Sequence, residues 1–232
     1  IDVDLIEKKI TKKTKAIMPV HLSGIPSNLN KLKKICKKYN LFLIEDAAQS
    51  FGASYKGKKS CSFGDIASTS FFPAKPLGCY GDGGAIFTND KELADICKSI
   101  RVHGQGKDKY DNVRIGLNSR LDTIQANVLL NKLKIFDKEI ILRNKVSNFY
   151  SKNLNDNLLV PYIEKSNVSV WAQYSLLTES TKIRNKLVNH LKNDGIPTAI
   201  YYKKLFSELE IYKELDNISS PVSKKISDCI FS

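Results

Sequence analysis

Short apolar runs alternate along the chain with amphipathic segments, a pattern typical of strands joined by helices into a mostly parallel sheet. Strands are predicted at residues 16–22, 41–46, 66–72 and 84–89. One helix is predicted at residues 28–40, and another from Asp90, as its N-cap, to about Val102. We therefore expect an α/β fold.

A longer helical pattern runs from Leu121 to about Leu154, with a predicted break near Phe136 and Asp137. After it the pattern changes. A strand at 169–179, a helix at 181–194 and a strand at 196–202 describe a small α+β domain. We place the boundary near residue 155, between a large domain (1–155) and a small domain (156–232).

Both ends of the chain look interrupted. Residue 1 is Ile rather than Met, and the sequence stops at Ser232 within an apolar run. We expect an internal piece of a longer protein, with a large domain incomplete at its N-terminus and a small domain incomplete at its end.

The net charge of +13 raises nucleic acid or a membrane as a partner. Only five of the 37 basic residues are Arg, and no aromatic residues interleave the lysines as a base-stacking surface needs. No apolar stretch reaches the length of about 20 residues that spans a bilayer. We expect neither partner.

Five cysteines, with no CxxC pair, indicate neither a disulfide framework nor a zinc site, and no metal is expected. Cysteines outside such frameworks are typical of a reducing compartment. This usage predicts a cytoplasmic protein.

Asp46 and Lys75 each follow a predicted strand, where ligands of open α/β sheets gather. Pyridoxal phosphate needs a carboxylate beside its ring nitrogen and an amine that carries it as a Schiff base. Asp46 could instead cap the following turn, and Lys75 could be an ordinary surface lysine. Its setting, between Phe-Phe-Pro-Ala and a glycine-rich turn, favours the functional interpretation.

Two further polar residues could contact this cofactor. Ser70 ends the strand before Lys75, where its hydroxyl could donate to the phosphate. The Gln49 amide could face the ring or its 3-hydroxyl, beside Asp46. The GDGG segment lacks the spacing of a nucleotide-binding fingerprint. We assign His21 and His103 no proton-transfer role.

Several blocks of the sequence resemble, in the same order, the DegT/DnrJ/EryC1/StrS family of sugar aminotransferases. They are HLSG (21–24), EDAAQS (45–50), SFFPAKPLGCYGDGG (70–84), RVHGQGKD (101–108) and GLNSRLDTIQANVLL (116–130). The resemblance implies a type I aminotransferase fold, with a mostly parallel large domain and a smaller α+β domain, working as a homodimer. It also implies pyridoxal 5'-phosphate as cofactor, held by Lys75, Asp46, Gln49 and Ser70.

The resemblance adds three kinds of substrate and subunit contact. Asn118 matches an asparagine that reaches the phosphate of the neighbouring subunit. Arg120 matches an arginine that meets an acidic group, although it could equally pair with Asp122 at a helix start. Tyr201 and Tyr202 stand where the family often has histidine and tyrosine in a loop that holds the nucleotide sugar.

The resemblance implies transfer of an amino group from L-glutamate to a nucleotide-linked keto-sugar, with a UDP-linked 3-keto N-acetylated sugar acid as the most similar substrate class. The related dehydratases have histidine in place of the lysine, so Lys75 speaks against them. The alternative is a non-catalytic protein that binds cofactor or nucleotide sugar in a regulatory or scaffold role.

Overall fold

The computed structural model describes residues 1–154, 158–212 and 219–232. The chain divides into two compact units, residues 1–144 with 163–172 and residues 145–162 with 173–232. Each unit is described by itself. A compact unit need not be a domain that folds alone, so the boundary near residue 155 stays a prediction.

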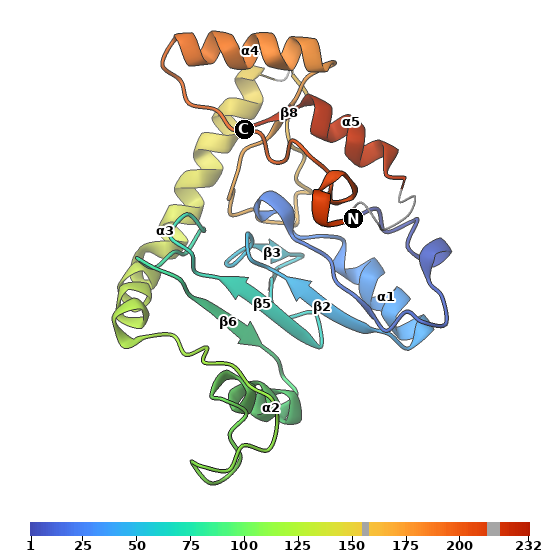
Figure 1. Cartoon of the computed structure of the whole chain (residues 1–232). Coiled ribbons are helices and arrows are strands. Elements are labelled where there is room, and N and C mark those ends of the chain that lie inside the picture. Colours follow the sequence, from blue (N-terminus) through green and yellow to red (C-terminus); the bar gives the residue numbers. More distant parts are fainter. Residues whose placement is uncertain (155–157, 213–218) are drawn as a thin grey trace. The chain divides into compact units, whose positions relative to one another are not determined.

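A four-stranded sheet forms the centre of the first unit. Its strands, in spatial order, are β1 (Ala16–Ile17), β2 (Phe42–Asp46), β5 (Ile66–Ser70) and β6 (Gly84–Phe87). The first three run parallel, and β6 runs antiparallel to β5 (Figure 1). All four predicted strands are confirmed, although β1 is shorter than expected. A small antiparallel pair, β3 (Ser54–Tyr55) and β4 (Lys58–Lys59), lies between β2 and β5 in the chain.

The two predicted helices of this unit are confirmed, with their caps. α1 (Leu29–Tyr39) begins after Asn28, whose side chain accepts a hydrogen bond from the Lys31 N–H, and ends at Asn40 in the left-handed conformation. α2 (Lys91–Arg101) begins after Asp90. Two short 3₁₀ helices, η1 (Glu7–Lys9) and η2 (Leu22–Gly24), precede α1.

One apolar face of α1 closes the first core. Leu29 and Leu32 are fully buried, and they belong to one cluster with Leu43 of β2, Tyr55 and Phe63. Each buried leucine contributes about 1.5–3 kcal/mol relative to an exposed one. This packing holds α1 beside the strands that carry the proposed site.

The predicted break near Phe136 and Asp137 is wrong. α3 runs unbroken from Thr123 to Leu154. Phe136 and Ile140 are one turn apart and both buried in a second core, where the Phe136 ring stacks on Phe51 at 5.9 Å between centroids. These contacts stabilise the helix across the position where the sequence pattern weakens.

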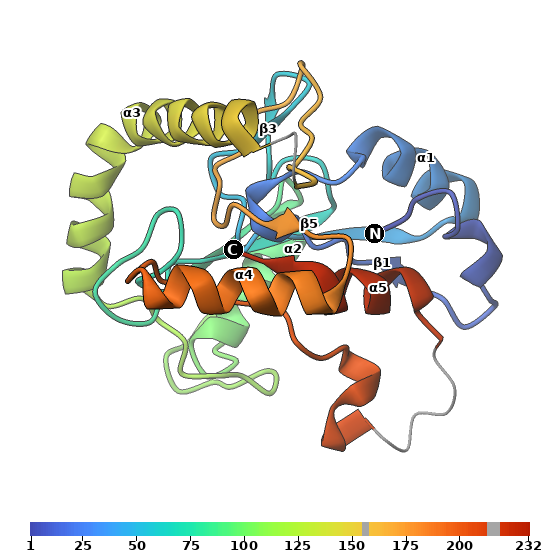
Figure 2. The same ribbon diagram turned by 90° about the horizontal axis from the view of Figure 1, so that it is seen from above.

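Beyond the last residues of α3, the described part of the second unit contains two helices, two short strands and two 3₁₀ helices. They are β7 (Leu176–Leu177), α4 (Thr181–Asn193), η3 (Phe206–Glu208), η4 (Glu210–Tyr212), α5 (Pro221–Cys229) and β8 (Ile230–Phe231). β7 pairs antiparallel with β8, and α4 contacts α5 (Figure 2). The helix predicted at 181–194 is confirmed, whereas α5 and β8 were not predicted.

Both strands predicted after residue 155 are mostly wrong. Of residues 169–179, only Leu176 and Leu177 form a strand. Trp171 has φ +50°, which no regular strand accommodates. Of residues 196–202, only Ala199 pairs like a strand, exchanging two 2.8 Å backbone hydrogen bonds with Ser232.

The cap of α2 provides a test of this fold. The Asp90 carboxylate accepts a hydrogen bond from the Leu93 N–H at 3.0 Å. We expect Asp90→Ala to lower the free energy of unfolding by about 1 kcal/mol, because an N–H of the first turn loses its partner. Asp90→Asn keeps a side-chain oxygen that can accept this hydrogen bond, so its free energy of unfolding should fall by only a small part of that amount. Urea denaturation followed by circular dichroism measures both, and equal losses would contradict the cap.

Candidate active site

Asp46 and Ser70 lie at the same edge of the sheet. Asp46 is the last residue of β2 and Ser70 the last of β5. The two strands are parallel, with Asp46 opposite Ser68, so their carboxyl ends meet at one edge. This is the edge where ligands bind in open α/β sheets.

Asp46 both caps a turn and keeps a free oxygen. Its Oδ1 accepts a hydrogen bond from the Ala48 N–H at 3.0 Å. Its Oδ2 has no hydrogen-bond donor within residues 1–154, 158–212 and 219–232. The two interpretations of Asp46 are therefore compatible, because one oxygen holds the turn and the other is available to a cationic ring nitrogen.

Gln49 lies in the turn that follows β2 and is 7% exposed. Its Oε1 accepts a hydrogen bond from the Ser23 N–H at 2.5 Å. The amide oxygen is thus fixed by the backbone, which leaves the amide NH₂ as the group that could donate to a ligand. Contact between Gln49 and a cofactor ring stays a prediction.

Lys75 lies in a loop that is closed at several points. The Phe71 N–H donates to the Gly83 carbonyl at 2.8 Å, and the Lys75 N–H donates to the Phe72 carbonyl at 2.9 Å. Within this loop the Ser70 hydroxyl accepts from the Phe72 N–H at 3.2 Å. The Lys75 side chain is half-buried, and its Nζ has no hydrogen-bond or ion-pair partner in the described part of the chain.

The turn after Lys75 is tightly packed. A Cβ added at Gly78 would lie 2.5 Å from the Pro73 carbonyl oxygen, so the turn requires glycine there. The Gly78 carbonyl accepts from Lys132 Nζ at 2.6 Å, and the buried Cys79 thiol donates to the Phe71 carbonyl at 3.0 Å. These contacts fix the backbone of the loop that carries Lys75. Less conformational entropy is then lost when the Lys75 amine binds a ligand.

Asn118 and Arg120 contact each other on the surface. Nη2 of Arg120 donates to Oδ1 of Asn118 at 2.9 Å, and both residues are exposed. Asp122 instead accepts from the Gln125 N–H at 2.9 Å, as a cap of α3. Among the described residues Arg120 and Asp122 form no ion pair, so the pairing considered for them is not observed.

Tyr201 and Tyr202 belong to the second unit. Their side chains are 37% and 55% exposed, and their rings meet edge to face with centroids 5.6 Å apart. The Tyr202 carbonyl accepts from the Ser227 hydroxyl at 2.7 Å, which holds this segment beside α5. Exposed aromatic faces could contact a sugar, and this role stays a prediction.

A buried hydrogen-bonded pair beside the site was not predicted. His21 and Glu45 are both fully buried, with Nε2 and Oε2 3.1 Å apart. Burial acts to raise the pKa of Glu45, but hydrogen bonds from His21 and from the Gly64 and Phe63 N–H groups outweigh it and lower the pKa. The signal in the sequence is a glutamate inside the otherwise apolar strand LFLIED.

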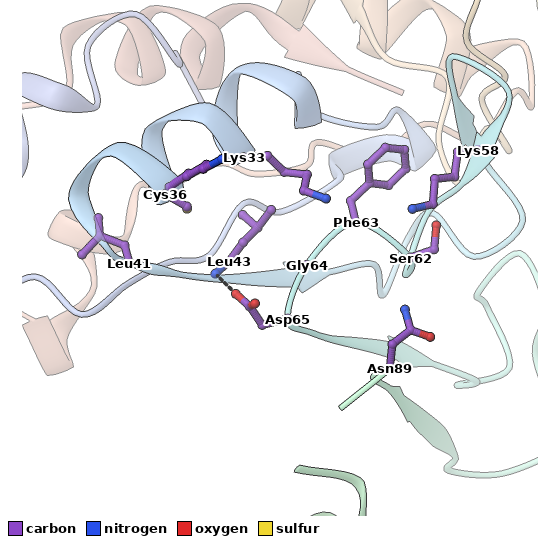
Figure 3. A pocket seen from close by; sticks show the side chains of 11 residues that line it. Lys33, Cys36, Leu41, Leu43, Lys58, Ser62, Phe63, Gly64, Asp65 and Asn89 are labelled. Atoms are coloured by element: carbon purple, nitrogen blue, oxygen red, sulfur yellow. Dashed lines mark hydrogen bonds between the residues drawn. The ribbon is translucent and has the colours of Figure 1, made fainter. Parts of the chain in front are cut away.

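A hollow of about 370 Å³ lies at the other edge of the sheet (Figure 3). Its wall includes Leu43, near the start of β2, and Asp65, just before β5. The Asp65 carboxylate accepts from the Leu43 N–H at 2.7 Å. Because Asp46 and Ser70 end these strands, this hollow is distinct from the candidate active site.

Other kinds of site are not apparent in the part of the chain that the structure describes. There, no group of three or more His, Cys, Asp or Glu side chains could hold a metal ion. Within the same residues, no helix is both long and apolar enough to cross a membrane. All five cysteines are free thiols.

Comparison with known proteins identifies the group to which the chain is related. The sequence profile of the DegT/DnrJ/EryC1/StrS aminotransferase family matches residues 1–232. The chain belongs to this family. It is 51% identical over 203 residues to a UDP-2-acetamido-2-deoxy-3-oxo-D-glucuronate aminotransferase of Pseudomonas aeruginosa, covering 87% of this chain and 55% of that protein.

Two further relatives of this chain are informative. A pleiotropic regulatory protein of Geobacillus stearothermophilus is 42% identical over 206 residues, covering 87% of this chain and 54% of that protein. The crystal structure of a DegT DnrJ EryC1 StrS aminotransferase from Brucella abortus is 44% identical, with a TM-score of 0.94, over all of this chain and 64% of that one. The chain thus spans about half the length of these two curated relatives, and the predicted type I aminotransferase fold is confirmed.

The Cys61 thiol, next to Glu45, provides a test of this environment. Burial, together with the Glu45 charge, raises the pKa of Cys61 to about 12. At pH 8 only about one thiol in 10⁴ is then ionised, and the thiolate is the reactive form. We expect Cys61 to resist iodoacetamide in the folded protein and to react at an ordinary rate in denaturant, as measured by mass spectrometry. Rapid labelling in the folded state would contradict this environment.

Proposed function

We propose that the whole protein is a pyridoxal 5'-phosphate-dependent aminotransferase that moves an amino group from L-glutamate to a nucleotide-linked keto-sugar. The reaction converts L-glutamate and the keto-sugar into 2-oxoglutarate and the amino sugar. The observation that carries the proposal is that two groups, Asp46 Oδ2 at the end of β2 and Lys75 Nζ in the closed loop after β5, have no hydrogen-bond partner among the described residues. Membership of an aminotransferase family supports it.

The residues present fit this cofactor. When bound, pyridoxal phosphate withdraws electrons from the carbon that carries the amino group and holds that group between the two half-reactions. Asp46 would keep the ring nitrogen protonated, Gln49 would donate to the ring oxygen, and Ser70 would bind the phosphate. Lys75 would hold the cofactor covalently and, once released, take the proton from the α carbon of glutamate.

The guanidinium group of Arg120 favours a substrate that carries an acidic group. Among the described residues, one of its guanidinium nitrogens is engaged, by Asn118, so the other donors could bind a carboxylate. The P. aeruginosa relative is named for a UDP-linked 3-oxo-glucuronate, a sugar that carries a carboxylate. We therefore propose a UDP-linked 3-keto N-acetylated sugar acid as substrate, with Tyr201 and Tyr202 contributing to its binding.

The assembly we propose is a homodimer in the cytoplasm with a shared active site. Asn118 is exposed in the single chain and would reach the cofactor phosphate of the neighbouring subunit. The five free thiols are consistent with a reducing compartment. Size-exclusion chromatography with light scattering would measure the oligomeric state directly.

A non-catalytic role is the second candidate. It is favoured by the G. stearothermophilus relative, which is named a pleiotropic regulatory protein. Such a protein could bind cofactor or nucleotide sugar without turnover. Reaction of the wild-type protein with L-glutamate would exclude this candidate.

Lys75→Ala tests the proposed function in the full gene product. We expect the wild type, mixed with pyridoxal phosphate and reduced with borohydride, to carry the cofactor on the peptide that contains Lys75. The wild type should also show a visible absorption band from the bound cofactor, which disappears when L-glutamate is added. Lys75→Ala should lack both the label and this band. Lys138→Ala, an exposed lysine of α3, is the matched control and should behave like the wild type.

The same preparations test the substrate. A set of UDP- and dTDP-linked keto-sugars with L-glutamate should give the highest kcat/KM for a UDP-linked 3-keto sugar acid. Full transaminase activity in Lys75→Ala, or a label on another lysine, would overturn the role of Lys75. Preference for neutral sugars would overturn the substrate class alone.

Asp46→Asn tests the role of the carboxylate. The amide keeps an oxygen that can accept from the Ala48 N–H, so the turn should persist, but it cannot stabilise a protonated ring nitrogen as a charge does. We expect kcat to fall about 100-fold or more, the size of effect seen when a preorganised electrostatic partner is removed. A steady-state assay measures it, and activity within threefold of the wild type would refute the assignment.

A further inference from the structure

The strongest unassigned feature is the buried pair formed by His21 and Glu45. Their side chains are 0% exposed, and no role in the proposed reaction uses either of them. A carboxylate this deeply buried is costly unless each of its oxygens has hydrogen-bond donors. Its hydrogen bonds therefore indicate what it holds in place.

Glu45 binds the segment that leads into β5. Its Oε1 accepts from the Phe63 N–H at 2.6 Å and from the Gly64 N–H at 2.7 Å, while Oε2 accepts from the Cys61 N–H at 3.1 Å. With His21, the carboxylate has four donors. This number compensates for its removal from water and fixes its two oxygens in position.

His21 is fixed on both sides of its ring. Nε2 meets Glu45, and Nδ1 accepts from the Ser27 N–H at 3.2 Å. Nε2 must then carry the proton and donate to the carboxylate. The ring therefore ties the chain at residue 21 to β2.

The segment tied down by His21 holds the proposed cofactor residues. The His21 N–H donates to the Asp46 carbonyl at 3.0 Å, and the Asp46 N–H donates to the Pro19 carbonyl at 3.0 Å. Two residues after His21, the Ser23 N–H binds the Gln49 side chain. Both backbone polar groups of Asp46 and the amide oxygen of Gln49 thus depend on residues 19–23.

We propose that His21 and Glu45 are positioning residues, which fix the Asp46 carboxylate and the Gln49 amide for binding the cofactor ring through the segment 19–23. This role rests on the proposed function. Both side chains are fully buried, so neither is available for direct contact with a ligand. Loss of the pair would leave the strands in place but release the segment, so that Asp46 and Gln49 sample more orientations.

The test compares cofactor affinity in variants of the full gene product at fixed pH. His21→Leu removes both ring nitrogens, whereas His21→Gln keeps an amide that can donate to Glu45. Glu45→Gln keeps the shape of its side chain without the charge. Leu32→Ala, on the buried face of α1, is the matched control for a general loss of stability.

We expect His21→Leu and Glu45→Gln to raise the cofactor Kd about tenfold, the lower end of what loss of supporting hydrogen bonds costs at metal sites. His21→Gln should recover most of the affinity, and Leu32→Ala should stay within twofold of the wild type. In the cofactor-free protein, hydrogen exchange should accelerate in peptides covering residues 16–24 and 43–50 relative to α2. That measurement does not depend on turnover.

Two results would overturn the positioning role alone. One is an equal rise of Kd in Leu32→Ala, and the other is unchanged Kd and exchange in His21→Leu while the wild type binds cofactor. A wild type that binds no pyridoxal phosphate would overturn the proposed function itself, and the positioning role with it.

Discussion

The structure around the candidate site depends on one buried negative charge. Glu45 lies on the face of β2 that also presents Leu43 to the core, where a carboxylate is stable only with a full set of donors. Those donors come from His21, before α1, and from residues 61–64, before β5. The charge thereby binds three segments together that are distant in the sequence.

Much of the first unit follows from local signals. Asn28 and Asp90 mark the starts of α1 and α2 because each side chain satisfies an N–H that the helix leaves unpaired. The strand β2 begins with three apolar residues, and β5 carries Ile, Ala and Thr ahead of Phe71 and Phe72, a composition that suits short strands. The second unit is harder to predict, because Ala199 pairs with Ser232 across a large sequence separation and Trp171 adopts a positive φ. No local pattern encodes either feature.

The residues in and around the candidate site also differ in how far the sequence alone reveals them. Asp46, Ser70 and Lys75 could be singled out from the sequence as candidates, because each lies at or shortly after the end of a strand and its chemistry suits one cofactor. Their contacts with that cofactor stay predictions. The buried pair could not be singled out in this way, because His21 and Glu45 are 24 positions apart and only the fold brings them together. Its only local sign is a charge within an apolar strand.

Adjacent acids with different roles follow from the geometry of a strand. Successive side chains of a strand point to opposite faces, so Glu45 and Asp46 cannot share one environment. Glu45 is enclosed by donors that lower its pKa, and it therefore remains charged and inaccessible. Asp46 is half-buried at the sheet edge, and its second oxygen has no donor in the part of the chain that the structure describes. With the two acids exchanged, the buried carboxylate would stand on a side chain one methylene shorter, which would lengthen its hydrogen bonds to the N–H groups of residues 61–64. The order Glu-Asp therefore suits both positions.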